Sequence, residues 1–370
     1  MDRFSEIKGQ EIILSHLQNA LRTGGVSHAY ILNGAKGSGR HMLARSFSAA
    51  LLCENPQRIR QPQGDPEGAD PQAADPQEGD RPAGHPSSDT PDAGSWYLEP
   101  CGECLSCIQA FSGSNPDIIT VGHEKENSIS VGEIRRMRAD VQIRPYRAAH
   151  KVYIIPDAEK MTPAAQNALL KTLEEPPSYA VLLLLADGTA GFLPTILSRC
   201  VTLPLRPVAE KAVEEVLTDR FGADPMRARL CARFSGGSIG RAALLLQNED
   251  FASLRDRTVA FLREITKKDA AEIAAFAREA AAEDQTQDLI DFILMWNRDL
   301  LVCRSTFHTE NLIFTDEVQY IIEAARSVSW RGLQAASEAV FRARRRLASN
   351  VNAELTLQMM LLELRRAFRQ

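Results

Sequence analysis

Short apolar runs alternate with helical patterns over the first 206 residues of the chain. Several of these runs are too uniformly apolar for a sheet that has one face in water, so they predict buried strands. They lie at 28–33, 117–121, 151–155, 181–186 and 201–205. The patterns between them predict helices, for example at 10–23, 41–52, 131–143 and 163–173. Strands that alternate with helices predict a five-stranded parallel sheet with helices on both faces.

The pattern changes at Pro207, after which no strand-like run occurs. Residues 208–370 show one helical pattern after another, with breaks near Gly236-Gly237, Asn248 and Thr306. A chain of 370 residues is long enough for two or three domains. We therefore expect an α/β domain at 1–206, followed by an all-α region.

Residues 55–98 differ from the rest of the first domain. They are rich in Pro, Gly and Asp and contain almost no large apolar side chains. Such a segment cannot bury enough apolar surface to offset its chain entropy, so we expect a disordered acidic insertion. It is either a passive loop extension or a partner-binding segment. Its acids dominate the net charge of −5, and the rest of the chain is near neutral or slightly basic.

Composition excludes several classes of protein. The chain is 44% hydrophobic and 25% charged, which excludes fibrous and wholly disordered proteins. No apolar run approaches the roughly 18 residues of a membrane span, and residues 1–10 lack the apolar core of a secretory signal. We therefore expect a cytoplasmic protein without a membrane partner. Seven cysteines, an odd number, favour metal binding or burial over a disulfide framework.

A glycine-rich loop follows the first predicted strand and precedes a predicted helix. It reads Gly34-Ala35-Lys36-Gly37-Ser38-Gly39-Arg40-His41. This context is that of a P-loop, whose backbone N–H groups and helix N-terminus bind phosphates. The pattern needs Lys at position 40 for the phosphates and Ser or Thr at 41 for Mg²⁺. Arg40 keeps the charge in a wider, planar group, and His41 is a poor ligand for a hard cation. The loop predicts a degenerate nucleotide site or, alternatively, a simple turn.

The strand at 151–155 offers an independent test of ATPase activity. In an active P-loop ATPase such a strand is usually followed by Asp-Glu, where the Asp holds the metal and the Glu polarises the attacking water. Here Asp157 is followed by Ala158, and Glu159 lies one residue further on, where only a shifted register would let it serve. Asp157 is then a relic of metal binding. Three defects favour a lost ATPase that binds no ATP, because each part can be worth orders of magnitude in rate.

Three cysteines fall within seven residues, at Cys101, Cys104 and Cys107, and Cys53 ends the helix that follows the P-loop. Soft thiolates at this spacing predict a structural Zn²⁺ site with four Cys ligands, against the alternative of free thiols or a redox pair. The fourth ligand is Cys53, with His85 and His123 as substitutes. The other cysteines lie in apolar settings and are expected to be small buried hydrophobes. They are Cys200, Cys231 and Cys303.

These residues, in this order, resemble the bacterial clamp-loader subunits of the AAA+ superfamily. The resemblance spans most of residues 1–205 and is most specific in the string NALLKTLEEPP at 167–177. It also includes Gly9-Gln10, Ser27-His28-Ala29-Tyr30 and Leu197-Ser198-Arg199-Cys200. It implies a AAA+ domain, then a small helical lid at 207–249 and a helical collar for oligomerisation at 250–370. Arg241 takes the lid position that reaches nucleotide phosphate in active relatives.

Two kinds of subunit in that family carry the cysteines and the Ser-Arg-Cys. One, gamma or tau, keeps Gly-Lys-Thr and Asp-Glu and hydrolyses ATP, whereas the other, delta prime, has a broken nucleotide site. Arg40, His41 and Ala158 resemble the second kind. The resemblance then implies a non-catalytic subunit that offers Arg199, next to Ser198, to the ATP of a neighbouring gamma subunit. This trans arginine finger would act while the sliding clamp is loaded during DNA replication.

The partners implied by the resemblance are the gamma/tau and delta subunits of the DNA polymerase III clamp loader. The sliding clamp and primer-template DNA are partners through the assembled complex. Two alternatives stay open: a gamma-like ATPase in which Arg40 tolerates the Lys role, and a binding module in which the cysteines and the acidic segment recruit protein or nucleic acid. For Arg199 the alternative is an arginine that caps its own helix or pairs with an acid.

Overall fold

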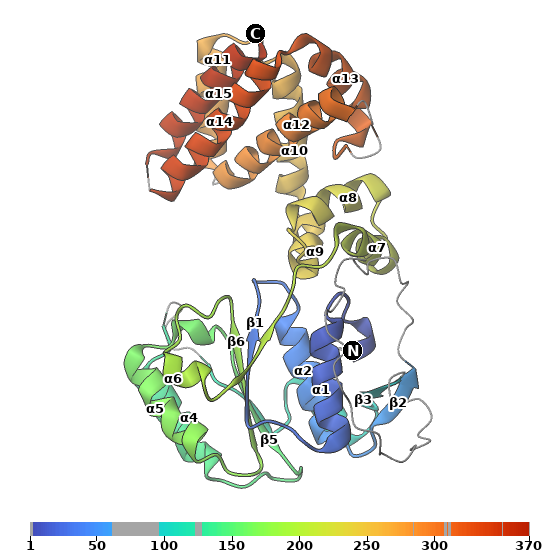
Figure 1. Cartoon of the computed structure of the whole chain (residues 1–370), viewed down its shortest axis with the longest axis vertical. Helices are drawn as coiled ribbons and strands as arrows, with labels where there is room; N and C mark the ends of the chain where they lie inside the picture. The colour runs from blue at the N-terminus through green and yellow to red at the C-terminus, as the bar shows by residue number, and fades with distance from the viewer. Residues whose placement is uncertain are drawn as a thin grey trace, which may run out of the picture. The chain divides into compact units, whose positions relative to one another are not determined.

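The computed structural model in Figure 1 describes residues 3–60, 96–122, 128–283, 285–306, 309, 312–349 and 351–369. The chain divides into two compact units, Met1–Arg206 and Pro207–Gln370. Among the helices in the described ranges, none has the length and apolar character that a membrane crossing requires.

The first unit is built on a five-stranded parallel sheet in the order β4-β5-β6-β1-β7. Its strands are β1 (Ala29–Asn33), β4 (Ile118–Thr120), β5 (Lys151–Ile155), β6 (Ala180–Ala186) and β7 (Val201–Pro204). All seven residues of β6 are buried, as expected for a central strand covered on both faces. The predicted fold class is confirmed, and β5 has the predicted limits.

Helices cover both faces of this sheet, as Figure 1 shows. On one face lie α1 (Glu11–Thr23) and α2 (Arg40–Leu52). On the other lie α4 (Val131–Val141), α5 (Pro163–Glu174) and the short α6 (Pro194–Leu197). Two 3-10 turns, η1 (Phe4–Glu6) and η2 (Ala158–Lys160), and helix α3 (Leu105–Ser112) complete the unit.

Neighbouring residues of each strand enter opposite cores, because side chains alternate along a strand. In β1, Tyr30 and Leu32 pack with the α1/α2 layer, whereas Ala29 and Ile31 pack with the α4/α5 layer. This parallel arrangement brings the carboxyl ends of β5, β6 and β1 side by side, because these three strands are neighbours. Loops at these ends are therefore the natural place for a binding site.

The ends of the predicted disordered insertion 55–98 are ordered, which corrects that prediction. Strand β2 (Gln57–Arg60) pairs antiparallel with β3 (Trp96–Glu99). Tyr97 is buried in the α1/α2 core, and the Gln18 side chain accepts a hydrogen bond from Leu98 N and donates one to Leu98 O. These partners lie 80 residues away in sequence, so the local composition could not reveal them. Residues 61–95 lie outside the described residues.

Glu99 fixes the N-terminus of the chain to this ribbon. Its fully buried carboxylate accepts hydrogen bonds from Phe4 N at 3.0 Å and Ser5 N at 2.6 Å. We expect Glu99→Ala to lower the free energy of unfolding by about 2–4 kcal/mol, because it leaves two N–H donors without an acceptor. Urea denaturation of the full chain measures this loss. The exposed neighbour Glu103, replaced by Ala, is the control, and equal losses in the two variants would contradict the assigned role.

The second unit is entirely helical in its described residues. Its helices are α7 (Glu210–Phe221), α8 (Pro225–Phe234), α9 (Ile239–Gln247), α10 (Glu249–Glu264), α11 (Ala270–Ala282), α12 (Thr286–Thr306), α13 (Val318–Ser327), α14 (Trp330–Ala348) and α15 (Ala353–Phe368), with the 3-10 turn η3 (Thr315–Glu317). The predicted breaks are confirmed: α8 ends before Gly236 and Gly237, which have φ of 60° and 82°, and Asn248 separates α9 from α10. One hydrophobic cluster runs from Val208 to Ala367, and the division into lid and collar stays a prediction.

Candidate functional site

The P-loop connects β1 to α2 and depends on its glycines. Gly37 and Gly39 have φ of 83° and 94°, values that favour glycine. A Cβ on Gly34 would approach Ser38 Oγ to 2.7 Å and Leu205 Cβ to 2.8 Å. The loop therefore keeps the tight path of a phosphate-binding loop although two of its functional side chains have changed.

Arg40 points inward from the first position of α2 and is only 3% exposed. Its Nη1 donates to Gly34 O at 3.0 Å and pairs with Asp187, and its Nη2 pairs with Asp157 Oδ1 at 3.0 Å. Gly34 follows β1, Asp157 lies beyond β5, and Asp187 follows β6. One guanidinium thus joins the carboxyl ends of three neighbouring strands.

Asp157 is held in the left-handed region, with φ of 44° and ψ of 44°. Its second oxygen, Oδ2, pairs with Lys160 Nζ at 3.1 Å. Ala158, in the place of the water-activating acid, is fully buried in the core. Glu159 lies against Gly191, where a Cβ would meet Glu159 O at 2.9 Å. The structure therefore joins Asp157 to the P-loop by its ion pair with Arg40. Position 158 carries a buried alanine in place of an acid.

His41 is exposed at the start of α2, next to Arg40. Although the residue is exposed overall, partial burial of its ring and the positive charge of Arg40 lower the pKa of its imidazole. A neutral imidazole is the expected form at neutral pH, and it is a soft ligand compared with the oxygen donors that Mg²⁺ prefers. Arg241 lies in α9 of the second unit, where its backbone N–H binds the Ser238 side chain. Its relation to the P-loop stays a prediction.

Four cysteine sulfurs form a compact cluster. The Sγ atoms of Cys53, Cys101, Cys104 and Cys107 all lie within 4.8 Å of one another, and those of Cys101 and Cys107 are 3.9 Å apart. Helix α2 ends just before Cys53, and Cys104 is the N-cap of α3, so two helix ends converge there. The substitutes His85 and His123 lie outside the described residues. A cluster of this kind could bind a metal ion.

Backbone N–H groups surround these sulfurs. Cys101 N donates to Cys53 Sγ at 3.3 Å, Cys104 N to Cys101 Sγ at 3.3 Å and Cys107 N to Cys104 Sγ at 3.4 Å. Burial raises the pKa of Cys101, but the N–H groups of Cys104 and Glu103 lower it to about 7. Hydrogen bonds of this kind stabilise the thiolate form.

The remaining cysteines behave as small hydrophobes. Cys231 and Cys303 are buried, and Cys200 is half-buried. Burial raises the pKa of Cys200 to about 12 and that of Cys231 to about 11. These thiols stay protonated at neutral pH, and among the described residues the four-sulfur cluster does not include them.

Ser198 and Arg199 follow α6 on the surface of the first unit. Arg199 Nη1 donates to Thr195 O at 3.1 Å and to Ser198 Oγ at 3.4 Å, and its Nη2 pairs with Glu174 Oε1 at 3.0 Å. The side chains of Arg199 and Glu174 are 36% and 49% exposed. Within its own chain Arg199 therefore caps helix α6 and pairs with an acid. These are the two contacts expected if it is not an arginine finger. Its action in trans stays a prediction.

Asp187 and Glu174 were not predicted from the sequence. Asp187 comes directly after an uninterrupted apolar strand, β6, which is the neighbour of β1 in the sheet. A polar residue at the carboxyl end of a strand beside the P-loop is a signal that could have identified it. Glu174 belongs to the 167–177 string but had no predicted role.

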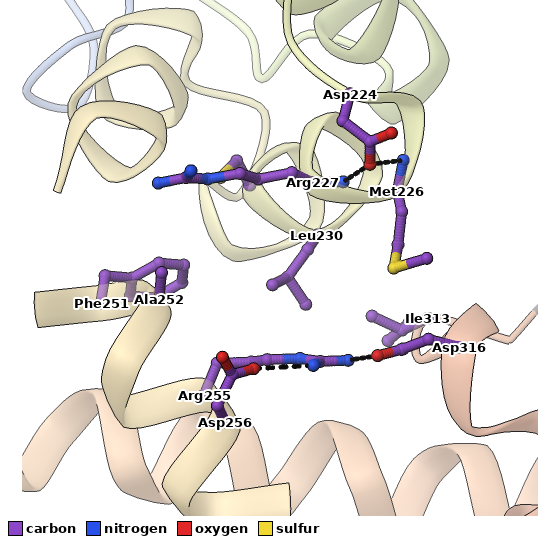
Figure 2. Close-up of a pocket in the computed structure, with 11 residues that line it drawn as sticks. Asp224, Met226, Arg227, Leu230, Phe251, Ala252, Arg255, Asp256, Ile313 and Asp316 are labelled. Atoms are coloured by element: carbon purple, nitrogen blue, oxygen red, sulfur yellow. Dashed lines mark hydrogen bonds and ion pairs between the residues drawn. The ribbon is translucent and has the colours of Figure 1, made fainter. Parts of the chain in front are cut away.

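A separate pocket of about 200 Å³ lies in the second unit between α8, α10 and η3 (Figure 2). Leu230 and Phe251 belong to its apolar lining. Arg255 on its wall pairs with Asp256 at 2.9 Å and with Asp316. No residue predicted to bind nucleotide or metal lines this pocket, and Arg255 is already neutralised by two acids.

The chain is similar to known subunits of DNA polymerase III. A family model described as DNA polymerase III, delta subunit, matches residues 9–67 and 90–209, and a second model, for the C-terminal part of the delta subunit, matches residues 253–366. DNA polymerase III subunit delta' of Bacillus subtilis is 27% identical over 360 residues, 96% of each chain. Subunit tau of Bacillus subtilis is 29% identical over 72% of this chain, which spans 39% of that relative's length.

A solved structure of a gamma subunit-related protein from Thermotoga maritima covers 95% of this chain and 99% of that chain, with 17% identity and a TM-score of 0.43. The first family model covers most of the first unit, and the second lies within the helical second unit. The chain therefore belongs to the clamp-loader subunits of DNA polymerase III.

Proposed function

We propose that this chain is a delta-prime type of clamp-loader subunit, which does not hydrolyse ATP and lends Arg199 to the ATP of a neighbouring gamma or tau subunit. The observation that carries the proposal is the inward position of Arg40, with its guanidinium bound to Asp157 and Asp187. The similarity to a delta' subunit over 96% of both chains supports it.

Three changes at the P-loop act together against hydrolysis. Arg40 uses its guanidinium within the chain rather than for a phosphate. Position 41 carries an imidazole in place of the hydroxyl that would bind Mg²⁺, and the acid that would polarise water is the buried Ala158. Each of these parts alone can be worth several orders of magnitude in rate, so their joint loss leaves no catalytic apparatus at this P-loop.

Arg199 is well placed to act outside its own chain. An exposed ion pair is worth about 0–1 kcal/mol, so release from Glu174 costs little. A guanidinium is always charged and presents several N–H donors in a fixed plane. With these properties a guanidinium can stabilise the negative charge that spreads over a γ-phosphoryl group during its transfer. Ser198 supports this turn, because its Oγ donates to Thr195 O at 3.2 Å and accepts from Arg199.

The four cysteines hold a structural Zn²⁺ ion in this proposal. A Zn–S bond of about 2.3 Å in a tetrahedron places two sulfurs about 3.8 Å apart. The distance of 3.9 Å between Cys101 and Cys107 fits this value. Four thiolate ligands leave no open position on the metal, so the ion organises the segment between α2 and α3 without a catalytic role.

The proposed partners are the gamma or tau and delta subunits in the cytoplasm. The sliding clamp and primer-template DNA are met through the assembled loader. The competing proposal is a gamma- or tau-like ATPase, which the 29% identity to tau and the intact glycine geometry of the P-loop favour.

A titration of the purified full-length chain with labelled ATP and Mg²⁺ separates the two proposals. We expect no turnover and no Mg²⁺-dependent binding, because Arg40 occupies the carboxylates at the end of β5 and β6. Filter binding and thin-layer separation of labelled phosphate measure both quantities, with an active tau subunit as positive control. Tight binding that requires Mg²⁺ and leads to turnover would support the ATPase instead.

A further inference from the structure

The carboxyl ends of β5, β6 and β1 are tied together by one side chain. Arg40 reaches Asp157 beyond β5, Asp187 after β6 and the carbonyl of Gly34 after β1. The acids are 117 and 147 residues away from Arg40 in sequence. The backbone ladder joins these strands as far as the pairs Asn33↔Ala186 and Ile155↔Leu184, and Arg40 connects the segments beyond the end of that ladder.

The charges at this junction balance only because Arg40 is there. Asp157 and Asp187 both lie within reach of one guanidinium, so the two carboxylates are close enough to repel each other without it. Lys160 also pairs with Asp157, through Oδ2. Arg40 is 3% exposed, whereas Asp157 and Asp187 are 33% and 48% exposed, so the guanidinium is shielded from water while the acids are partly screened by it.

Two carboxylates beside a phosphate-binding loop are also what a metal–nucleotide complex would need. A hard divalent cation takes carboxylate oxygens as ligands, and it neutralises them as it binds. In this chain the guanidinium already takes Asp157 and Asp187. A cation could bind both acids only after Arg40 had been displaced.

We propose that Arg40 is an internal cation lock: its guanidinium substitutes for a bound metal–nucleotide by holding Asp157 and Asp187 together, so the first unit keeps its arrangement without nucleotide. The lock rests on the proposed function, since a subunit that never turns over ATP needs a permanent neutralising group where active relatives have a transient one. In this proposal Arg40 has a structural role, in addition to being a residue unsuited to ATP hydrolysis.

Calorimetric unfolding of the full-length chain without nucleotide tests the lock. Arg40→Met keeps an unbranched, buried side chain but removes the charge. We expect it to lower the midpoint of the first unit's transition by about 4–8 °C. The control is Arg147→Met, which removes an exposed ion pair to Glu54 and should lower the midpoint by less than about 2 °C. Equal shifts in the two variants would overturn the proposal.

A charge-removal variant separates ion pairing from packing. In Arg40→Met the two acids repel each other. Adding Asp157→Asn and Asp187→Asn should therefore reverse more than half of the fall in the midpoint of the unfolding transition. If the triple variant is no more stable than Arg40→Met, the arginine contributes packing alone and there is no lock.

Magnesium chloride provides the second test, with sodium chloride at matched ionic strength as the control. We expect Mg²⁺ at about 10 mM to raise the midpoint of Arg40→Met, because the two freed carboxylates can bind it, and to leave the wild-type midpoint unchanged. If Mg²⁺ raises the midpoint of the wild-type chain, or fails to raise that of Arg40→Met, the guanidinium does not take the place of a metal ion. These measurements need no nucleotide and do not involve Arg199, so they fail independently of the proposed function.

Discussion

Replacing Arg199 by alanine is expected to abolish rapid ATP hydrolysis at one site of a reconstituted clamp loader. The physical reason is the loss of an always-charged group from the transferring phosphoryl, an effect of about 10³–10⁵ in kcat for arginine fingers. Quenched-flow measurement of the first turnover counts the ATP molecules that are hydrolysed quickly. That count should fall by about one per complex, because only one neighbour receives this arginine.

The contacts of Arg199 within its own chain provide the control. Glu174→Ala removes its ion-pair partner but leaves the guanidinium in place. If Arg199 acts in trans, Glu174→Ala keeps the full count of rapid hydrolyses. If Arg199 matters only as the partner of Glu174, the two variants lose the same amount. Arg199→Lys keeps the charge without the planar fork, and we expect an intermediate rate.

Assembly must be measured in the same experiment. Arg199 is at the surface, so Arg199→Ala is expected to change the free energy of unfolding by less than about 1 kcal/mol. Size-exclusion chromatography of the mixed subunits should give the same complex as the wild-type chain. A normal count of hydrolyses by an intact Arg199→Ala complex would rule out the finger.

Replacing Cys107 by serine is expected to release the proposed zinc ion and unfold the segment around α3. Structural zinc sites bind with an apparent free energy of about 10–16 kcal/mol in zinc-finger peptides, and that energy supports folding of the segment. Cys107 is fully buried, and its sulfur is 3.9 Å from that of Cys101. The remaining three thiols cannot close a tetrahedral site, so most of the affinity should be lost.

Elemental analysis of the purified chain measures this directly. We expect about one zinc per wild-type chain and well under half of that in Cys107→Ser. Cys231→Ala, which removes a buried thiol of the second unit, is the matched control and should keep the metal. A wild-type chain with well under one equivalent, or a Cys107→Ser variant with a full equivalent, would contradict the four-cysteine site.

The structure also changes how the degenerate P-loop is understood. From the sequence, Arg40 and His41 are failed replacements for Lys and Ser or Thr. In the folded chain Arg40 has three hydrogen-bond partners, each beyond the end of a different strand. Arg40 thus departs from the P-loop pattern, which has Lys at this position, and at the same time makes a structural contact.

Much of the fold was already determined by local sequence patterns. Apolar runs identified all five strands of the parallel sheet, and strand 151–155 was predicted with its observed limits. The cysteine spacing identified three thiols of the cluster within seven residues, and the glycines marked the P-loop. These features depend on residues a few positions apart, where side-chain periodicity and backbone conformation act directly.

Tertiary structure alone decided which distant groups meet. Asp187, which was not predicted, reaches Arg40 because β6 lies beside β1. Cys53 was predicted as the fourth cysteine, and it meets Cys101 from 48 residues away because α2 and α3 converge. The ordered ribbon at the ends of the insertion exists because Glu99 and Leu98 find partners in η1 and α1. Such contacts depend on strand order and on the direction of long polar side chains, and neither leaves a periodic trace in the chain itself.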